Sequence, residues 1–462
     1  MSDDPTGPKN PDREVTESAE QATFRDIFAL REYRAVFGSQ LISWVGDYFS
    51  RAAVTVLVYQ QTDSVLLSAA SFATGYLAAI VAGPLLSSVA ERYPYRRVMI
   101  ASDLFRMVMI GLLLIPHLPA PAVLATLLLA SFGGPPAQAA RSALTPMIVG
   151  RERLSLALAA YQTAGQAAQV AGYLVGATVA VTLGPRAALG LDVLSFAASA
   201  LLVTVAVADR PAALAPERRT HLLRETGEGY RLIFGEPALR SIAIVVFTVI
   251  VFSIVPESLA ASWAAEGSAH GNQGLDQGAI MAASPLGWVI GGLLFSRLVP
   301  EARRVRLVPP LAVLTPLLLV PALLGPPIPV VVLLVLGCGM CVGALFPTLN
   351  ATFVLLVPPS HRARAFGVVS SGIQASQFLA VIVTGGLADR FPLPRVVGLW
   401  SLGGALLMLA VALRWPRPER FALVREAATG TATPGTSTAT EPEPSTTVAE
   451  VTPMPRVTPE RS

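Results

Sequence analysis

The sequence predicts an all-α membrane protein with twelve transmembrane helices in two pseudo-symmetric six-helix bundles. Three observations predict this fold. Hydrophobic residues make up 53% of the 462 residues and charged residues only 14%, a balance unlike that of soluble globular domains. The chain also holds a series of stretches that reach the ~20 mainly apolar residues a bilayer-spanning helix needs. Finally, motifs after the second and fourth stretches recur in the second half of the chain.

The predicted spans follow one another with short polar breaks. They cover residues 35–60, 65–90, 98–117, 121–141, 155–182, 187–208, 241–263, 277–297, 305–324, 328–356, 365–388 and 396–415. We expect an N-terminal bundle over residues 31–208, a cytoplasmic central loop over 209–240 and a C-terminal bundle over 241–416. Residues 1–30 lack the apolar core of a signal peptide, and residues 417–462 are rich in Thr, Pro, Ala and Glu. Both segments are predicted to be disordered cytoplasmic tails.

The arginines are distributed unevenly between the two sets of loops. With the N-terminus inside the cell, the cytoplasmic loops hold 17 arginines, whereas the opposite loops hold only Arg186, Arg390 and Arg395. Cytoplasmic loops are enriched in Lys and Arg, so both termini are predicted to be cytoplasmic and the protein to cross the cell inner (plasma) membrane many times. The formal net charge of +4 then reflects topology, and no nucleic-acid partner is predicted.

Two basic motifs recur at matching places in the halves. LTPMIVGRERLSLA has Pro146 before Arg151 and Arg153, and LLVPPSHRARAFG has Pro358 before a similar arginine pair. Each motif follows the fourth span of its half. Short basic loops, AERYPYRRVM and SRLVPEARRVRL, likewise follow the second span of each half. The repeat favours two six-helix halves.

The only two cysteines, Cys338 and Cys341 in GCGMC, lie within the tenth predicted span. Their spacing would suit a redox or zinc site, but no second CxxC and no nearby His completes one. We predict that they pack as small buried residues, with no metal and no cofactor.

Residues 25–415 resemble the major facilitator superfamily of transporters. The loop ERYPYRRVM matches the family motif GxxxDRxGRR, with Glu91 in the acidic place, Arg92 in the basic place, Arg96 and Arg97 as the paired arginines, and Ser87 where a glycine is typical. The phrases REYRAVFGSQLISWVGD, ALTPMIVGRERL, GLDVLSF and PPSHRARAFGV are similar to the twelve-helix efflux branch of enterobactin exporters and macrolide efflux pumps.

The resemblance implies a conformational latch in this loop. Glu91 would face a helix N-terminus of the opposite half, which carries about half a positive charge, while Arg92, Arg96 and Arg97 would bind acidic or lipid partners. The alternative is a basic loop that only sets the topology. The resemblance also implies that helices one, four, seven and ten line a central cavity, whereas helices three, six, nine and twelve support it.

A charged side chain within a span costs about 2.5–3.5 kcal/mol at mid-bilayer unless a partner or water compensates it. The candidates are Asp47, Arg51, Asp103, Arg106, Arg141, Asp192 and Glu257. Asp47 and Arg51 are four residues apart and Asp103 and Arg106 are three apart, so each pair is predicted to neutralise itself on one helix face. From the implied helix roles, Asp103, Arg106 and Asp192 are predicted to be structural. Asp47, Arg51, Arg141 and Glu257 remain as cavity candidates.

Glu257 is the predicted proton carrier, with Asp47 also assigned to proton coupling. Glu257 follows Pro256 and has no basic residue within a turn, so removal from water is expected to favour its protonated form. The alternative is an acid near the outer surface that simply reaches water. Asp47, beside Arg51, is expected to stay ionised.

The predicted cavity combines polar side chains with an apolar and aromatic wall. The candidates for substrate contact are Arg51, Gln40, Tyr48, Arg141, Gln166, Gln169, Asn350, Gln374 and Gln377. Interhelical hydrogen bonding is the alternative role for the amides. This combination favours an amphipathic organic substrate over a sugar or inorganic ion.

The sequence therefore predicts a monomeric secondary active transporter in the lipid bilayer, which exports a small molecule against protons by alternating access. It holds no GxxxxGK[ST], HExxH or GxSxG motif, so neither ATP use nor enzyme activity is predicted. Uptake by symport or facilitated diffusion on the same fold is one alternative. A non-transporting membrane sensor or assembly protein is another.

Overall fold

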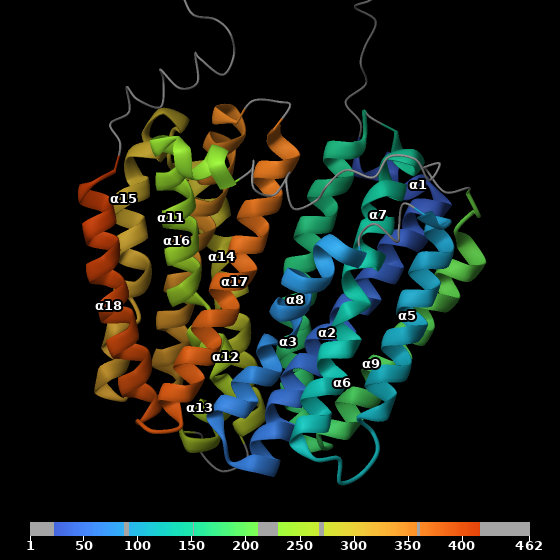
Figure 1. The fold of residues 1–462 in the computed structure, drawn as a ribbon, viewed down its shortest axis with the longest axis horizontal. Coiled ribbons are helices and arrows are strands. Elements are labelled where there is room, and N and C mark those ends of the chain that lie inside the picture. The colour runs from blue at the N-terminus through green and yellow to red at the C-terminus, as the bar shows by residue number, and fades with distance from the viewer. Residues whose placement is uncertain are drawn as a thin grey trace, which may run out of the picture.

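The computed structural model describes residues 23–86, 92–150, 152–210, 230–267, 272–357 and 361–415. Every regular element in these ranges is helical. The helices run roughly side by side in two groups, and the long helices extend from one end of the molecule toward the other (Figure 1).

The first group contains the elements up to residue 206. They are α1 (Phe24–Ala29), α2 (Arg31–Thr62), α3 (Val65–Leu86), α5 (Tyr95–Leu112), α6 (Ala120–Phe132), α7 (Gly134–Val149), α8 (Leu154–Thr182) and α9 (Pro185–Ala206). The second group follows on the other side of Figure 1. It contains α11 (Pro237–Ser253), α12 (Val255–Ser258), α13 (Ala260–Gly267), α14 (Gln273–Leu298), α15 (Glu301–Leu317), the 3₁₀ turn η2 (Val320–Leu324), α16 (Ile328–Leu356), α17 (Arg362–Ala388) and α18 (Leu393–Leu413).

Ten helical segments of the described chain are long and apolar enough to cross a membrane, with α6 and α7 together forming one of them. α5 and α8 run alongside these segments (Figure 1) but are more polar. α5 carries four charged side chains and α8 three glutamines. The all-helical membrane fold is confirmed, whereas the prediction of twelve spans depends on counting α5 and α8.

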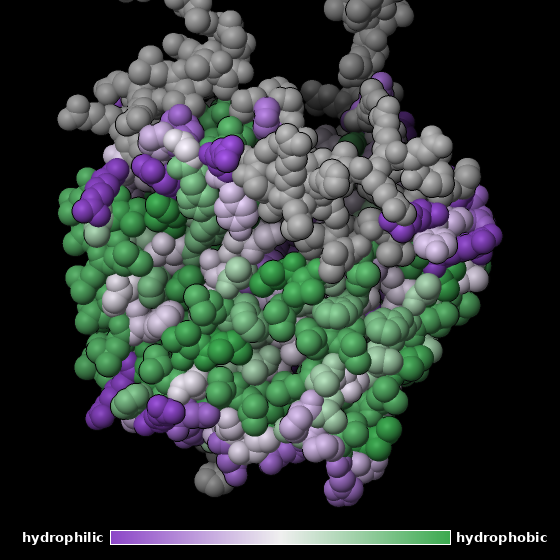
Figure 2. Space-filling view, in the orientation of Figure 1, coloured by the Kyte–Doolittle hydropathy of each residue, from purple (hydrophilic) through white to green (hydrophobic). Residues whose placement is uncertain are grey.

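A broad band of hydrophobic side chains covers the middle of the molecule, and hydrophilic side chains gather toward both ends (Figure 2). Large apolar side chains of α9 and α18 are strongly exposed, for example Leu201, Val205, Leu399 and Leu406. Exposed apolar area on this scale would be unfavourable in water and is suited to contact with lipid chains. The surface therefore identifies a multi-pass membrane protein.

The two groups pack against each other through α3 with α17 and α8 with α14. Small residues allow this approach. A Cβ atom added to Gly278 of α14 would lie 2.9 Å from Cα of Leu174 on α8, closer than real Cβ contacts, so a larger residue would force the helices apart. Gln277 next to it donates to the carbonyl of Ala52 on α2 at 3.1 Å. This close packing fits the way in which membrane helices associate through small residues.

The segment that carries Glu257 is broken into three pieces. α11 ends at Ser253, the four-residue α12 begins at Val255 with Pro256 in its first turn, and α13 continues from Ala260. Proline is favoured in the first turn of a helix because its missing N–H is not needed there. The break thus sets Glu257 in a short helix between two longer ones.

Candidate transport cavity

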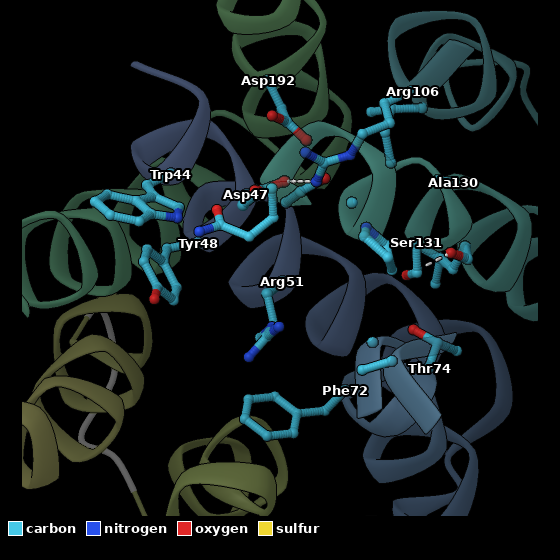
Figure 3. A pocket seen from close by; sticks show the side chains of 18 of the residues that line it. Trp44, Asp47, Tyr48, Arg51, Phe72, Thr74, Arg106, Ala130, Ser131 and Asp192 are labelled. Atoms are coloured by element: carbon cyan, nitrogen blue, oxygen red, sulfur yellow. Dashed lines mark hydrogen bonds and ion pairs between the residues drawn. The ribbon is translucent and has the colours of Figure 1, made fainter. Parts of the chain in front are cut away.

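A cavity of about 610 Å³ lies among α2, α3, α5, α6, α7 and α9 and reaches Ser370 of α17 in the second group. Its wall combines aromatic rings, including Trp44, Tyr48 and Phe72, with the charged side chains of Asp47, Arg51, Arg106 and Asp192 (Figure 3). Polar groups such as Gln138 continue the wall along α7. The cavity is amphipathic and large enough for a small organic molecule.

Asp47 forms an ion pair with Arg106 of α5, not with Arg51 of its own helix. The prediction that Asp47 and Arg51 neutralise each other is therefore wrong, and so is the prediction of an Asp103–Arg106 pair. The reason is the direction of the side chains: Asp47 points to the Arg106 guanidinium, whereas Arg51 points away from it toward Phe72 of α3 (Figure 3). Arg106 also lies over the ring of Phe196, 4.3 Å from its centroid.

Arg51 lies among three aromatic rings. Its guanidinium carbon is 5.1 Å from the ring centroid of Phe72, 5.7 Å from Tyr76 and 5.9 Å from Tyr48. None of the described carboxylates lies within ion-pair distance of it. Cation–π contacts contribute about 0.5–2 kcal/mol each, so the rings partly compensate the missing carboxylate, and Arg51 lies on the cavity wall.

Glu257 connects the two helix groups. Its carboxylate accepts a hydrogen bond from the Tyr173 hydroxyl of α8 at 2.6 Å and a longer one from Gln169 Nε2 at 3.5 Å. Glu257 is only 6% exposed, so the alternative of an acid that simply reaches water is wrong. The Tyr173 ring packs 5.0 Å from the ring of Tyr48, which lines the cavity. Glu257 therefore lies one aromatic layer behind the cavity wall.

Gln40 and Arg141 lie inside the first helix group, where they hydrogen-bond to each other. Both are buried, and neither lines the 610 Å³ cavity. Asp103 of α5 accepts a hydrogen bond from the Ser199 hydroxyl of α9 at 2.6 Å. These contacts suit the alternative that such polar groups join helices to one another.

The remaining predicted amides are dispersed. Asn350 lines a separate pocket of about 170 Å³ among α11, α16 and α17, and Ser370 lines both this pocket and the larger cavity. Gln166, Gln374 and Gln377 are half-buried on α8 and α17 and do not line the larger cavity. The structure thus does not bring these four amides together with Asp47 and Arg51.

The predicted latch can be followed only in part, because Glu91 lies outside the described residues. Arg96 donates to the carbonyl of Thr204 at the end of α9, and Arg97 pairs with Asp209 at 3.2 Å. Arg92 is exposed. The two paired arginines therefore join the start of α5 to the C-terminal end of α9, within their own helix group.

Arg106 and Asp192 were predicted to be structural, yet both line the cavity. Asp192 packs against α2 because Gly46 leaves room for it: a Cβ at Gly46 would collide with Asp192 and Ser195. Their charge within a span could have indicated a place on the cavity. They were assigned a structural role because the resemblance implies that helices three and six only support the cavity. Tyr173 was also missed as the partner of Glu257.

The helical membrane fold around an amphipathic cavity is typical of membrane transporters. A family model described as Major Facilitator Superfamily matches residues 36–340 and 276–445, and the chain belongs to this superfamily. Among curated proteins, the enterobactin exporter EntS of Shigella boydii serotype 4 (strain Sb227) is 30% identical over 281 residues, 59% of this chain and 64% of the relative. EntS of Escherichia coli O157:H7 (strain EC4115 / EHEC) is 29% identical over 282 residues, with the same coverage. The chain thus spans about 64% of the length of these relatives.

Solved structures share the fold at low sequence identity. A POT family transporter in complex with 5-aminolevulinic acid has a TM-score of 0.67 at 12% identity, covering 86% of this chain and 98% of that one. A bacterial homologue of the iron transporter ferroportin in an inward-facing state has a TM-score of 0.62 at 13% identity, covering 86% and 99%. At such identities the likeness shows the fold alone.

Proposed function

We propose that this transporter exports a small amphipathic organic molecule in exchange for protons, by alternating access between its two helix groups. The observation that carries this proposal is Glu257: a buried carboxylate of the second group bound by Tyr173 of the first. A carboxylate in such a place accepts hydrogen bonds when ionised and can donate one when protonated. Binding or loss of a proton there changes a contact between the two groups.

Inward proton flow supplies enough free energy for export. Moving one charge through 100 mV yields about 2.3 kcal/mol, and about 1.4 kcal/mol corresponds to a tenfold ratio. One proton therefore supports a roughly fortyfold substrate gradient from the membrane potential alone.

The contacts between the helix groups support an alternating-access cycle. Gln277 with Ala52, Gly278 with Leu174, and Asp389 with the start of α3 all join the groups. The start of α3 lies at the end of the molecule that bears the turn between α2 and α3 (Figure 1). In the proposed topology, with both termini cytoplasmic, this end is the outer one. The structure then represents a state closed to the outside.

Two features support an organic substrate and its export. The cavity wall alternates aromatic rings with charged and hydroxyl groups, which suits an amphipathic molecule better than an inorganic ion. The curated relatives are named as enterobactin exporters, which favours outward transport over uptake.

The test is Glu257→Gln, with Glu266→Gln as the matched control. Glu266 is an exposed acid on α13, in the same segment of the chain. Inverted membrane vesicles are energised, and accumulation of an amphipathic fluorescent dye that the unchanged protein transports is measured. Glu257→Gln should abolish proton-driven accumulation, because glutamine cannot carry a proton, while Glu266→Gln should transport like the unchanged protein. Intact proton-driven accumulation in Glu257→Gln would remove Glu257 from the mechanism.

A further inference from the structure

Asp192 is a buried carboxylate without an ion-pair partner on the wall of the cavity. Asp192 is 0% exposed and belongs to the residues that line the cavity. Oδ1 accepts a hydrogen bond from the Ser195 hydroxyl at 3.1 Å, whereas Oδ2 has no hydrogen-bond partner among the described residues. The carboxylate points toward the Asp47–Arg106 pair (Figure 3).

The charges around Asp192 do not balance. Its helix, α9, packs against α2, α5 and α8. α2 presents Asp47, whereas Arg51 of the same helix points away toward Phe72 (Figure 3). α5 presents Arg106 and, about one turn away, Asp103, which accepts a hydrogen bond from Ser199. α8 carries no acidic or basic residue. Its tyrosines are engaged elsewhere, because Tyr173 binds Glu257 and the Tyr161 ring packs on Tyr33.

Asp47, Asp192 and Arg106 thus form a cluster of two carboxylates and one guanidinium, and the guanidinium is bound to Asp47. If both acids were ionised, the cluster would hold one uncompensated negative charge in a low-dielectric place. Two nearby carboxylates that cannot both be compensated share a proton instead. The acid without the arginine is the one that takes it.

We infer that Asp192 holds a proton at neutral pH and forms a second proton-binding site of the transporter, beside the Asp47–Arg106 ion pair. A proton on Oδ2 would turn this unpartnered oxygen into a hydrogen-bond donor. The hydroxyl of Ser50, which is also buried without a described partner, lies on the same cavity wall and would be its acceptor. Because Asp192 belongs to the cavity wall, the cavity is the route by which a proton would reach it. Its part in transport rests on the proposed function, whereas its protonation does not.

The test uses infrared difference spectra of the purified full-length protein at neutral pH, which distinguish the carbonyl band of a protonated carboxyl from the bands of a carboxylate. The spectrum of the unchanged protein minus that of Asp192→Asn should show the carbonyl band of one protonated carboxyl. Asp47→Asn removes the excess negative charge, so Asp192 should become the ionised partner of Arg106. In an Asp47→Asn background, adding Asp192→Asn should therefore remove carboxylate bands and no carbonyl band.

Glu257→Gln is the matched control, since it removes a buried acid outside the cluster. In that background, adding Asp192→Asn should still remove the carbonyl band. The inference would be overturned if the first difference spectrum showed carboxylate bands and no carbonyl band. Misfolding of Asp192→Asn would overturn it as well, because asparagine matches the shape of a protonated aspartic acid and should replace it without loss of the fold.

The two proposals fail separately. An ionised Asp192 would leave the dye result for Glu257→Gln unaffected, and transport that survives Glu257→Gln would leave the spectrum of Asp192 unaffected.

Discussion

The carboxylate of Asp389 accepts a hydrogen bond from the backbone N–H of Val65 at 2.6 Å. Asp389 follows the last residue of α17, and Val65 is the first residue of α3. The same carboxylate accepts from Leu66 N at 3.1 Å and from the Ser64 hydroxyl at 3.0 Å. An acid from one helix group thus caps the positive N-terminus of a helix in the other, next to the close contact of Gly385 with Ala69.

Replacing Asp389 with alanine should weaken closure at this end. Loss of a helix cap costs about 1 kcal/mol, which corresponds to a roughly fivefold shift between conformations. Thr55 is buried beneath this end and contacts Gln277. In a Thr55→Cys background, Asp389→Ala should raise the rate of labelling by a water-soluble thiol reagent about fivefold.

Asp63→Asn is the control for this experiment, because Asp63 is an exposed acid at the same turn with a left-handed backbone that asparagine tolerates. It should leave the labelling rate unchanged. An equal rate in Asp389→Ala and the unchanged background would show that the cap does not hold the groups together.

Gly278→Ala should disturb the same closed state from inside the helix interface. The added Cβ would lie 2.9 Å from Cα of Leu174 and 3.0 Å from the carbonyl oxygen of Tyr173, and backbone atoms cannot move away cheaply. Overpacking costs about 1–3 kcal/mol, so transport of the dye should fall at least about fivefold. Gly403→Ala is the control, since its Cβ would meet open space within α18; equal transport by both variants would contradict tight packing of α14 on α8.

Removal of Arg106 alone should lower stability more than removal of both Asp47 and Arg106, because it leaves the Asp47 carboxylate without its partner. Breaking a buried ion pair leaves one charge unmatched and costs up to about 3–5 kcal/mol, and partial exposure of this pair reduces the loss. In detergent, the thermal unfolding midpoint Tm of Arg106→Gln should therefore be lower than that of the double variant Asp47→Asn with Arg106→Gln. Additive effects of the two substitutions would indicate that the charges do not interact.

A chain that ends at residue 425 should retain transport. The described helices, the cavity and both partners of Glu257 precede this point. Dye export from cells that express equal amounts of the full and shortened chains measures this. Loss of export with normal membrane insertion would support the alternative of a sensor or assembly protein that needs its terminal segment.

The order and type of the helices could be predicted because apolar length is a property of the sequence itself. Pairing of side chains was harder. The four-residue spacing of Asp47 and Arg51 suggested a pair within α2, but spacing on one helix does not say which neighbouring helix each side chain faces, and Arg106 lies on the side that Asp47 faces. For the same reason the structure was needed to place Asp192 on the cavity wall and Gln40 and Arg141 away from it.

Glu257 shows what sequence reasoning could and could not reach. Its isolation from basic residues along the chain predicted a buried acid that depends on its surroundings. Its partner, Tyr173, is 84 residues away, and only the packing of α8 near the break between α11 and α13 brings the two together. The capping of α3 by Asp389 spans 324 residues and had no local signal at all.

Proton-driven movement of substrate out of the cell tests the account most directly. Inverted vesicles, whose interior corresponds to the outside of the cell, are acidified inside, and the transport of an amphipathic dye is followed with and without a protonophore. The account predicts that the dye accumulates inside the vesicles while the proton gradient lasts and leaves when it is collapsed. The account would be contradicted if dye accumulation did not depend on the proton gradient, or if it occurred only when the gradient was reversed.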